Sequence, residues 1–323
     1  MCKFNHKVLI TGTTGFLGGH ILRTVDKKFS TAVLGRNKPN DYLGEFIEYD
    51  LKNTPVQGLN LQGIEVVIHS AARAHVMHDT SIDPLAEYRL VNTEATLDLA
   101  KSAAESGVKR FIFISSIKVN GESTSRRIPF TTSDHPCISD PYGQSKLEAE
   151  NRLKELAAKT GLEVVIIRPT LVYGPGVKAN FASLMNLVSK GIPLPFGCIT
   201  KNKRSLVSVD NLVDLIITCI DHPKAANQVF LVSDDHDIST SEMVREMAIA
   251  LEKPAWQLPV PFWCYKLVGK LFNKSSVVDR LTGSLQVDIS HTKDTLGWRP
   301  SQSLRDGFKQ TAEAFLHSKK KQW

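Results

Sequence analysis

The chain has few of the features that define several common protein classes. Its five cysteines are scattered, odd in number and without a Cys-x-x-Cys pair among 323 residues, which argues against a disulfide framework or a zinc site. No apolar run reaches the length of a membrane span, and the first seven residues hold no signal-peptide core. We therefore expect a cytoplasmic protein with reduced thiols, no transmembrane segment and no metal.

The positive charge of the chain is not patterned as in a nucleic-acid-binding protein. The net charge is +7, with basic clusters at 201–204 and 319–321, but aromatic residues are not interleaved with the basic ones. We expect no nucleic-acid partner. A solvated tail and an anion-binding loop account for the charge, and an interaction of the tail with an anionic membrane stays open.

Strand and helix patterns alternate over the first half of the chain, as in a doubly wound parallel sheet of the Rossmann-like α/β class. Prolines become frequent from Pro169 onward and divide the chain into shorter pieces. We expect a dinucleotide-binding domain at 1–169, a smaller substrate lobe at 170–310 and a basic tail at 311–323. Residues 205–220 are expected to return to the main sheet. The expected strands are 8–10, 31–34, 45–49, 65–69, 110–114 and 163–167, and the expected helices are 16–25, 85–105 and 142–159.

One apolar stretch, Pro261–Phe272, is interspersed with lysines. It could lie on a membrane surface or against a partner. A helix in the core of the lobe is the interpretation that we favour.

A glycine-rich segment follows the first expected strand. Gly12, Gly15 and Gly18 are spaced Gly-x-x-Gly-x-x-Gly ahead of a helix. Gly12 permits a tight turn, Gly15 lets a pyrophosphate approach the backbone, and Gly18 lets the helix pack close to the strand. The amides at the start of the helix would point at the phosphates. The segment therefore predicts a bound dinucleotide.

Tyr142 and Lys146 lie one helical turn apart, so their side chains share a face. A free phenol has a pKa of about 10, and a nearby cation favours the phenolate. The pair can therefore act as a general acid or base on a carbonyl or an alcohol. The expected strand at 110–114 runs into Ser115 and Ser116, whose hydroxyls could hold a substrate carbonyl beside Tyr142.

Taken together and in this order, the motifs resemble the extended short-chain dehydrogenase/reductase superfamily, and within it the nucleotide-sugar epimerase/dehydratase branch. The resemblance runs from about residue 7 to residue 300. It implies a UDP-sugar substrate, a homodimer and a catalytic triad of Ser116, Tyr142 and Lys146. Ser116 would orient the carbonyl, with Ser115 as the neighbouring alternative. Lys146 would lower the pKa of the tyrosine and bind the nicotinamide ribose.

The end of the second expected strand lacks the carboxylate that often accompanies a preference for NAD. Arg36 stands there instead and could cover a 2′-phosphate, so NADP(H) is favoured and NAD(H) is possible. By resemblance, Asp50 and Leu51 would contact the adenine, and Ala71 and Ala72 would let the cofactor pass. The predicted cofactor residues are Gly12, Thr14, Gly15, Phe16, Leu17, Gly18, Arg36, Asp50, Leu51, Ala71, Ala72, Tyr142 and Lys146.

The resemblance also implies a set of substrate-binding residues. Arg204 and Arg280 would bind the diphosphate, and Asn180 would assist them. Phe196 would pack against the uridine, while Ser116 and Tyr142 would face the sugar.

Three reactions are compatible with such a site. Dehydration is rejected, because Ile117 and Lys118 occupy the positions where related dehydratases place an Asp-Glu pair. A UDP-hexose or UDP-N-acetylhexosamine 4-epimerase with tightly bound NAD remains the alternative, although epimerases usually have tyrosine in place of Asn120 and an acid in place of Arg36. Residues 115–122 and 193–197 look most like reductases. On this resemblance we favour NAD(P)H-dependent reduction of a UDP-4-keto-6-deoxy-N-acetylhexosamine to UDP-N-acetylquinovosamine, for surface polysaccharide such as the O-antigen of lipopolysaccharide. A non-enzymatic dinucleotide-binding regulator is disfavoured because the triad is intact.

Overall fold

The computed structural model describes residues 4–52, 59–74, 81–125, 128–272 and 275–320. Its main feature is a seven-stranded sheet in which every neighbouring pair of strands is parallel. This confirms the predicted doubly wound α/β class. In sheet order, the strands are β3 (Glu45–Glu48), β2 (Phe29–Gly35), β1 (Phe4–Thr11), β4 (Val66–His69), β5 (Arg110–Ile114), β6 (Glu163–Pro169) and β9 (Val229–Val232).

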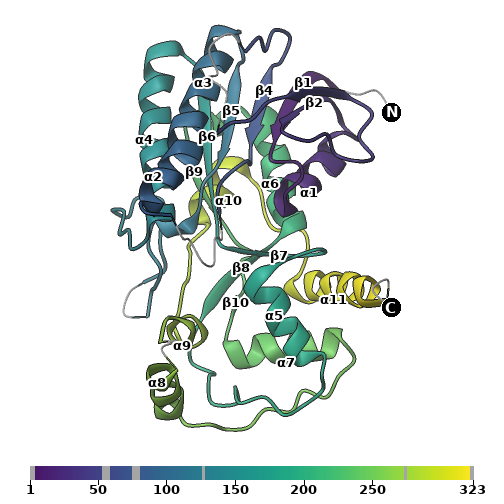
Figure 1. The fold of residues 1–323 in the computed structure, drawn as a ribbon, viewed down its shortest axis with the longest axis vertical. Helices are drawn as coiled ribbons and strands as arrows, with labels where there is room; N and C mark the ends of the chain where they lie inside the picture. The colour runs from purple at the N-terminus through teal and green to yellow at the C-terminus, as the bar shows by residue number, and fades with distance from the viewer. Residues whose placement is uncertain (1–3, 53–58, 75–80, 126–127, 273–274, 321–323) are drawn as a thin grey trace.

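Helices cover both faces of this sheet (Figure 1). One face is packed by α1 (Phe16–Val25), α6 (Val209–Asp221) and α10 (Ser290–Leu296), and the other by α3 (Ala95–Glu105) and α4 (Pro141–Thr160). In β1, Val8 and Ile10 belong to the first core and Leu9 to the second, as expected of a strand with alternating side chains. Burial on both faces explains why the strands are continuous apolar runs.

The strand order reverses at β1, which pairs with β2 on one side and β4 on the other. In open α/β sheets, such a reversal opens a crevice at the carboxyl ends of the strands. The glycine-rich turn leaves β1 at this crevice, and the segment after β4 borders it. The predicted cofactor residues therefore converge on one edge of the sheet.

The second half of the chain forms a lobe around a small three-stranded sheet. In sheet order it contains β10 (Asp237–Ile238), β8 (Arg204–Ser208) and β7 (Leu171–Tyr173). The rings of Tyr173 and Phe181 stack in its core, and the ring of Phe308 packs edge-on to both. The helices of the lobe are α5 (Ala179–Val188), α7 (Thr240–Ala250), α8 (Phe262–Leu271), α9 (Ser275–Thr282) and α11 (Leu304–Lys320).

Residues 205–220, which were predicted to return to the main sheet, divide between the two sheets. Strand β8 belongs to the small sheet, whereas α6 and β9 pack with the main sheet. Residues 311–320, expected as part of a solvated tail, continue helix α11, and its Thr311 and Ala312 are buried. The reason is the apolar face of α11, which the lobe core covers. No helix in the described ranges has the length and apolar character needed to cross a membrane.

We expect the contact between α1 and the β1 turn to be intolerant of a methyl group. A Cβ at Gly18 would lie 2.1 Å from the carbonyl oxygen of Gly12, so Gly18→Ala should cost about 1 to 3 kcal/mol of unfolding free energy. Gly35→Ala is the control, because a Cβ there meets nothing within 4 Å. Urea unfolding followed by circular dichroism measures the unfolding free energy of both variants. Equal stability of the two variants would contradict the close contact between Gly18 and Gly12.

Candidate active site

Tyr142 lies in the first turn of α4, at a helix start that the local sequence sets. Asp140 caps the helix by accepting a hydrogen bond of 2.6 Å from the backbone amide of Gly143, and Pro141 occupies the first helical position. The Tyr142 hydroxyl lies beside the side chain of Ser116, which follows β5 and begins the short helix η2 (Ile117–Val119). The structure thus brings the predicted proton donor and the predicted carbonyl-orienting hydroxyl together.

The neighbouring hydroxyl of Ser115 points elsewhere. It donates a buried hydrogen bond of 2.5 Å to Oε1 of Glu150. Ser116, not Ser115, is therefore the serine beside Tyr142.

Glu150 belongs to a buried network behind the site. Arg168 donates to its two carboxylate oxygens at 2.9 and 2.5 Å. The side chain of Glu150 is 0% exposed and that of Arg168 is 5% exposed. Arg168 also donates to the side chain of Asn120 at 2.9 Å, and Asn120 donates to the carbonyl of Thr131 at 2.8 Å. The network joins α4, β6, the end of β5 and the end of η2.

Lys146 is buried one turn further along α4 than Tyr142. Its Nζ donates to the carbonyl of Ile114 at 2.8 Å and lies 4.4 Å from the centre of the Phe113 ring. Burial lowers the pKa of Lys146 to about 7, and the negative charge of Glu150 opposes this shift.

The predicted effect of Lys146 on the tyrosine is absent from this arrangement. Burial raises the pKa of Tyr142, the carboxylate of Asp140 raises it further, and the hydrogen bond with Ser116 lowers it. The ammonium does not contribute, because it is directed at Ile114. The phenol is therefore held in its protonated form.

A short π-helix, η1 (Leu90–Glu94), interrupts the single helix that was expected at 85–105 and separates α2 (Pro84–Arg89) from α3. Its Asn92 is fully buried, accepts a hydrogen bond from the amide of Arg73 at 2.8 Å and donates to the hydroxyl of Ser145 at 3.0 Å. Such turns occur often at functional sites. Here the turn fastens α4 to the segment that borders the crevice.

His69, at the end of β4, is structural. Its two ring nitrogens lie 2.8 Å from the hydroxyl of Thr11 and 2.9 Å from that of Thr96. Complete burial lowers its pKa to about 3, so it stays neutral.

The backbone at the crevice fits a dinucleotide. Gly12 has φ +75°, and a Cβ there would lie 2.6 Å from the amide nitrogen of Ala71. Gly15 precedes α1, and no side-chain hydrogen bond caps that helix. The first turn therefore presents backbone amides to a phosphate, while Thr14 is exposed and Phe16 and Leu17 are half-buried beside it.

The other predicted cofactor residues lie at the same edge of the sheet. Arg36 follows β2 and is exposed, and Asp50 and Leu51 follow β3 and are half-buried. Ala71 and Ala72 follow β4, where the amide of Ala71 donates to the hydroxyl of Thr11 at 3.2 Å. Their contacts with a cofactor stay predictions.

Two of the predicted substrate residues are neighbours in the lobe. Nη1 of Arg204, at the start of β8, donates to the carbonyl of Arg280 in α9 at 2.7 Å. Burial lowers the pKa of Arg204, and the positive charge of Arg280 adds to this shift. Within the described ranges neither guanidinium has a carboxylate partner, so the pair offers positive charge to an anion.

The other two predicted substrate residues also belong to the lobe. Phe196 is 7% exposed and packs in the lobe core. Asn180 falls in the first turn of α5, but its side chain lies outside the described residues. Their roles stay predictions.

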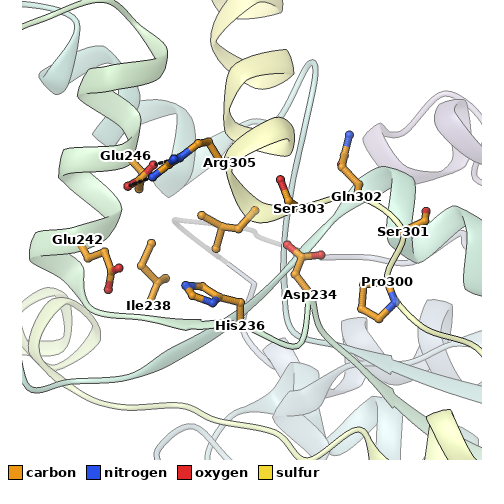
Figure 2. Close-up of a pocket in the computed structure, with 11 residues that line it drawn as sticks. Asp234, His236, Ile238, Glu242, Glu246, Pro300, Ser301, Gln302, Ser303 and Arg305 are labelled. Carbon is orange, nitrogen blue, oxygen red and sulfur yellow. Dashed lines mark hydrogen bonds and ion pairs between the residues drawn. The ribbon is translucent and has the colours of Figure 1, made fainter.

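A cavity of about 620 Å³ lies elsewhere in the lobe (Figure 2). None of the predicted site residues lines it. Its Asp234 accepts hydrogen bonds from Tyr173, Ser208 and Asn211, and its Glu246 pairs with Arg305. These side chains are satisfied by the fold and indicate no ligand.

Comparison with known proteins supports the same family. The profile of the NAD dependent epimerase/dehydratase family matches residues 8–233. A UDP-glucose 4-epimerase of Vibrio cholerae is 63% identical over 98% of this chain and 97% of its own length. An N-acetyl-α-D-glucosaminyl-diphospho-ditrans,octacis-undecaprenol 4-epimerase of Escherichia coli O157:H7 is 28% identical over 98% of this chain and 97% of its own length. Among solved structures, the UDP-glucose 4-epimerase of Thermotoga maritima has a TM-score of 0.77 at 22% identity, covering 97% of this chain and 99% of that one.

The chain therefore belongs to the NAD-dependent epimerase/dehydratase family, enzymes of the extended short-chain dehydrogenase/reductase type. The predicted family and enzyme class are confirmed.

The prediction of a 4-keto reductase is wrong. The relative at 63% identity is a 4-epimerase, which supports the alternative interpretation. Asn120, which argued against an epimerase, is fully buried and bonds Arg168 and the Thr131 carbonyl. It belongs to the structural network and so did not bear on the reaction.

Removing one partner of the buried ion pair should destabilise the protein. Glu150→Gln leaves the Arg168 charge buried without a counter-charge, which costs about 3 to 5 kcal/mol. Glu148→Gln, also in α4, is the matched control, because it loses a more exposed pair with Arg89 of α2. Urea unfolding should separate the two variants, and an equal loss of stability would contradict the role of the network.

Asp140→Asn should shift the pH dependence of the proton transfer. Asparagine still caps α4 but lacks the charge that raises the pKa of Tyr142. Because the phenolate then forms more easily, the rising limb of kcat/KM should move to lower pH by about one unit. Glu122→Gln is the control, since Glu122 also pairs with Lys118, at 3.0 Å. An unmoved limb, or one moved to higher pH, would refute this effect of Asp140.

Proposed function

We propose that the chain interconverts the C4 epimers of a UDP-sugar, using NAD. The observation that carries this proposal is the pair of neighbouring hydroxyls, Tyr142 and Ser116, together with a glycine cradle that fits a dinucleotide. The Vibrio cholerae relative, named a UDP-glucose 4-epimerase, supports the reaction and the substrate class.

The residues of the chain would divide the work as follows. NAD, when bound, would supply the chemistry of taking a hydride from C4 of the sugar and returning it. Tyr142 takes the proton of the C4 hydroxyl during oxidation and returns it to O4 during reduction. Ser116 holds O4 in place throughout. Lys146 would bind the nicotinamide ribose, and its ammonium would need to turn from Ile114 toward Tyr142 to favour the phenolate.

NAD is the cofactor that we propose over NADP. The family is defined by NAD, and a solved UDP-glucuronic acid 4-epimerase from Bacillus cereus, 20% identical to this chain with a TM-score of 0.76, is a complex with NAD. Arg36, the basis for favouring NADP, is exposed. We infer that it serves at most as a peripheral contact.

The diphosphate of the substrate would bind Arg204 and Arg280, with Asn180 and Phe196 in the supporting roles predicted from the sequence. Arg204 contacts the backbone of Arg280, and the two positive charges interact, so together they match the charge of a diphosphate. We also retain as proposals a homodimer, a cytoplasmic location and a role in supplying sugars for surface polysaccharide.

The purified protein should interconvert UDP-glucose with UDP-galactose, or the corresponding N-acetylhexosamines, without added dinucleotide. Tyr142→Phe should lower turnover by about 10² to 10⁴ and leave the amount of bound dinucleotide unchanged. Tyr88→Phe is the matched control, since its ring packs edge-on to Tyr142 at 6.0 Å and has no assigned proton transfer. Chromatography of the sugars measures turnover. Oxidation of added NADH or NADPH by a keto-sugar without interconversion of epimers would contradict the proposal.

A further inference from the structure

The tip of the lobe exposes a helix that was expected to be buried. We predicted that Pro261–Phe272 lies in the lobe core, and the structure contradicts this. In α8 only Gly269 is buried, and Trp263, Leu267 and Leu271 are 64%, 58% and 76% exposed. The helix is held instead by Tyr265, which packs on the lobe core and donates to the carbonyl of Pro195.

Exposed apolar side chains gather on α8 and on the segments that flank it. Trp263, Leu267 and Leu271 are four residues apart and so lie along a single face of α8. An apolar stripe on the solvent side of a helix reverses the usual orientation, and such patches mark interaction sites. The tip surface, as we call it, comprises Trp256, Leu258, Phe262, Trp263, Leu267, Val268, Leu271, Phe272 and Val277.

Between Glu252 and Asp279, the segment that carries the tip surface has charge of one sign. From Lys253 to Val278 the sequence contains four lysines and no aspartate or glutamate. Lys266 and Lys270 are exposed within α8 itself, and the ammonium of Lys266 lies 5.2 Å from the centre of the Phe262 ring. The tip surface is therefore both apolar and cationic.

This combination distinguishes between the possible occupants. A protein interface that buried the apolar stripe would also desolvate the lysines, which is costly without acidic partners. A second copy of the chain would bring the same lysines and no acid to this surface. At a bilayer, the rings and leucines enter the interface while the lysine stems extend to the phosphates.

We propose that the tip surface docks the lobe on an anionic lipid bilayer. The tip lies at the end of the molecule remote from the main sheet (Figure 1), so a flat surface can approach it. Helix α9, which carries Arg280, packs against α8. Docking would therefore place the arginine pair close to the headgroups. The surface is independent of the proposed reaction.

Vesicle sedimentation of the full chain tests the docking. The protein should pellet with vesicles of phosphatidylglycerol and phosphatidylethanolamine in equal parts, and not with phosphatidylcholine alone. Trp263→Glu and Leu267→Glu should each weaken binding by about tenfold or more, and Lys266→Glu should do so most at low salt. Ile249→Glu is the matched control, because this residue is 53% exposed elsewhere in the lobe and should bind as the wild type does.

Three outcomes would overturn the proposal. The first is that the wild type does not pellet with anionic vesicles. The second is that substitution of the tail lysines at 319–321 abolishes binding while Trp263→Glu does not. The third is that light scattering shows an oligomer that Trp263→Glu dissociates, which would make the tip surface an interface between copies. Turnover of a soluble UDP-sugar is measured in parallel. It should be unchanged in the tip variants, so a failure of docking is distinct from a failure of the proposed reaction.

Discussion

The buried ion pair between Glu150 and Arg168 fixes the geometry on which the site depends. Two charges in a nearly dry environment are stable only when each satisfies the other, so α4 and β6 are held in one register. The same carboxylate accepts a hydrogen bond from the hydroxyl of Ser115, and the same guanidinium donates one to the side chain of Asn120. Ser116 lies between these two anchored residues, and this leaves its hydroxyl beside Tyr142.

The site holds its two main titratable groups away from their ordinary pKa values in opposite directions. Burial raises the pKa of Tyr142 and lowers that of Lys146 to about 7. Separated pKa values of this kind are typical of sites that transfer protons near neutral pH. With Nζ bonded to Ile114, the proton rests on the phenol. Turnover then requires the ammonium of Lys146 and the phenol of Tyr142 to come closer. Both side chains lie on the same face of α4, so this is a change of side-chain position.

The sequence patterns predicted the parts of the molecule that rest on local rules. The strands, the glycine turn and the Tyr142–Lys146 face follow from periodicity and spacing, and the structure contains them. The choice of Ser116 over Ser115 and the position of Asn120 depend on Glu150 and Arg168, which are 18 residues apart along the chain but in contact in the fold. The helix at Pro261–Phe272 shows a further limit, because an apolar periodicity does not reveal whether the fold covers that face. The reductase prediction relied on the resemblance of residues 115–122 and 193–197 to reductases, and Asn120, which counted against an epimerase, has a structural role in the fold.

The fate of the hydrogen at C4 tests the central claim most directly. UDP-glucose deuterated at C4 is converted in the presence of excess unlabelled NADH, and the product is analysed by mass spectrometry and NMR. An epimerase in which Tyr142 moves only the hydroxyl proton must keep the deuterium on C4 of the galacto product. Loss of deuterium to the added dinucleotide pool or to water would contradict the account.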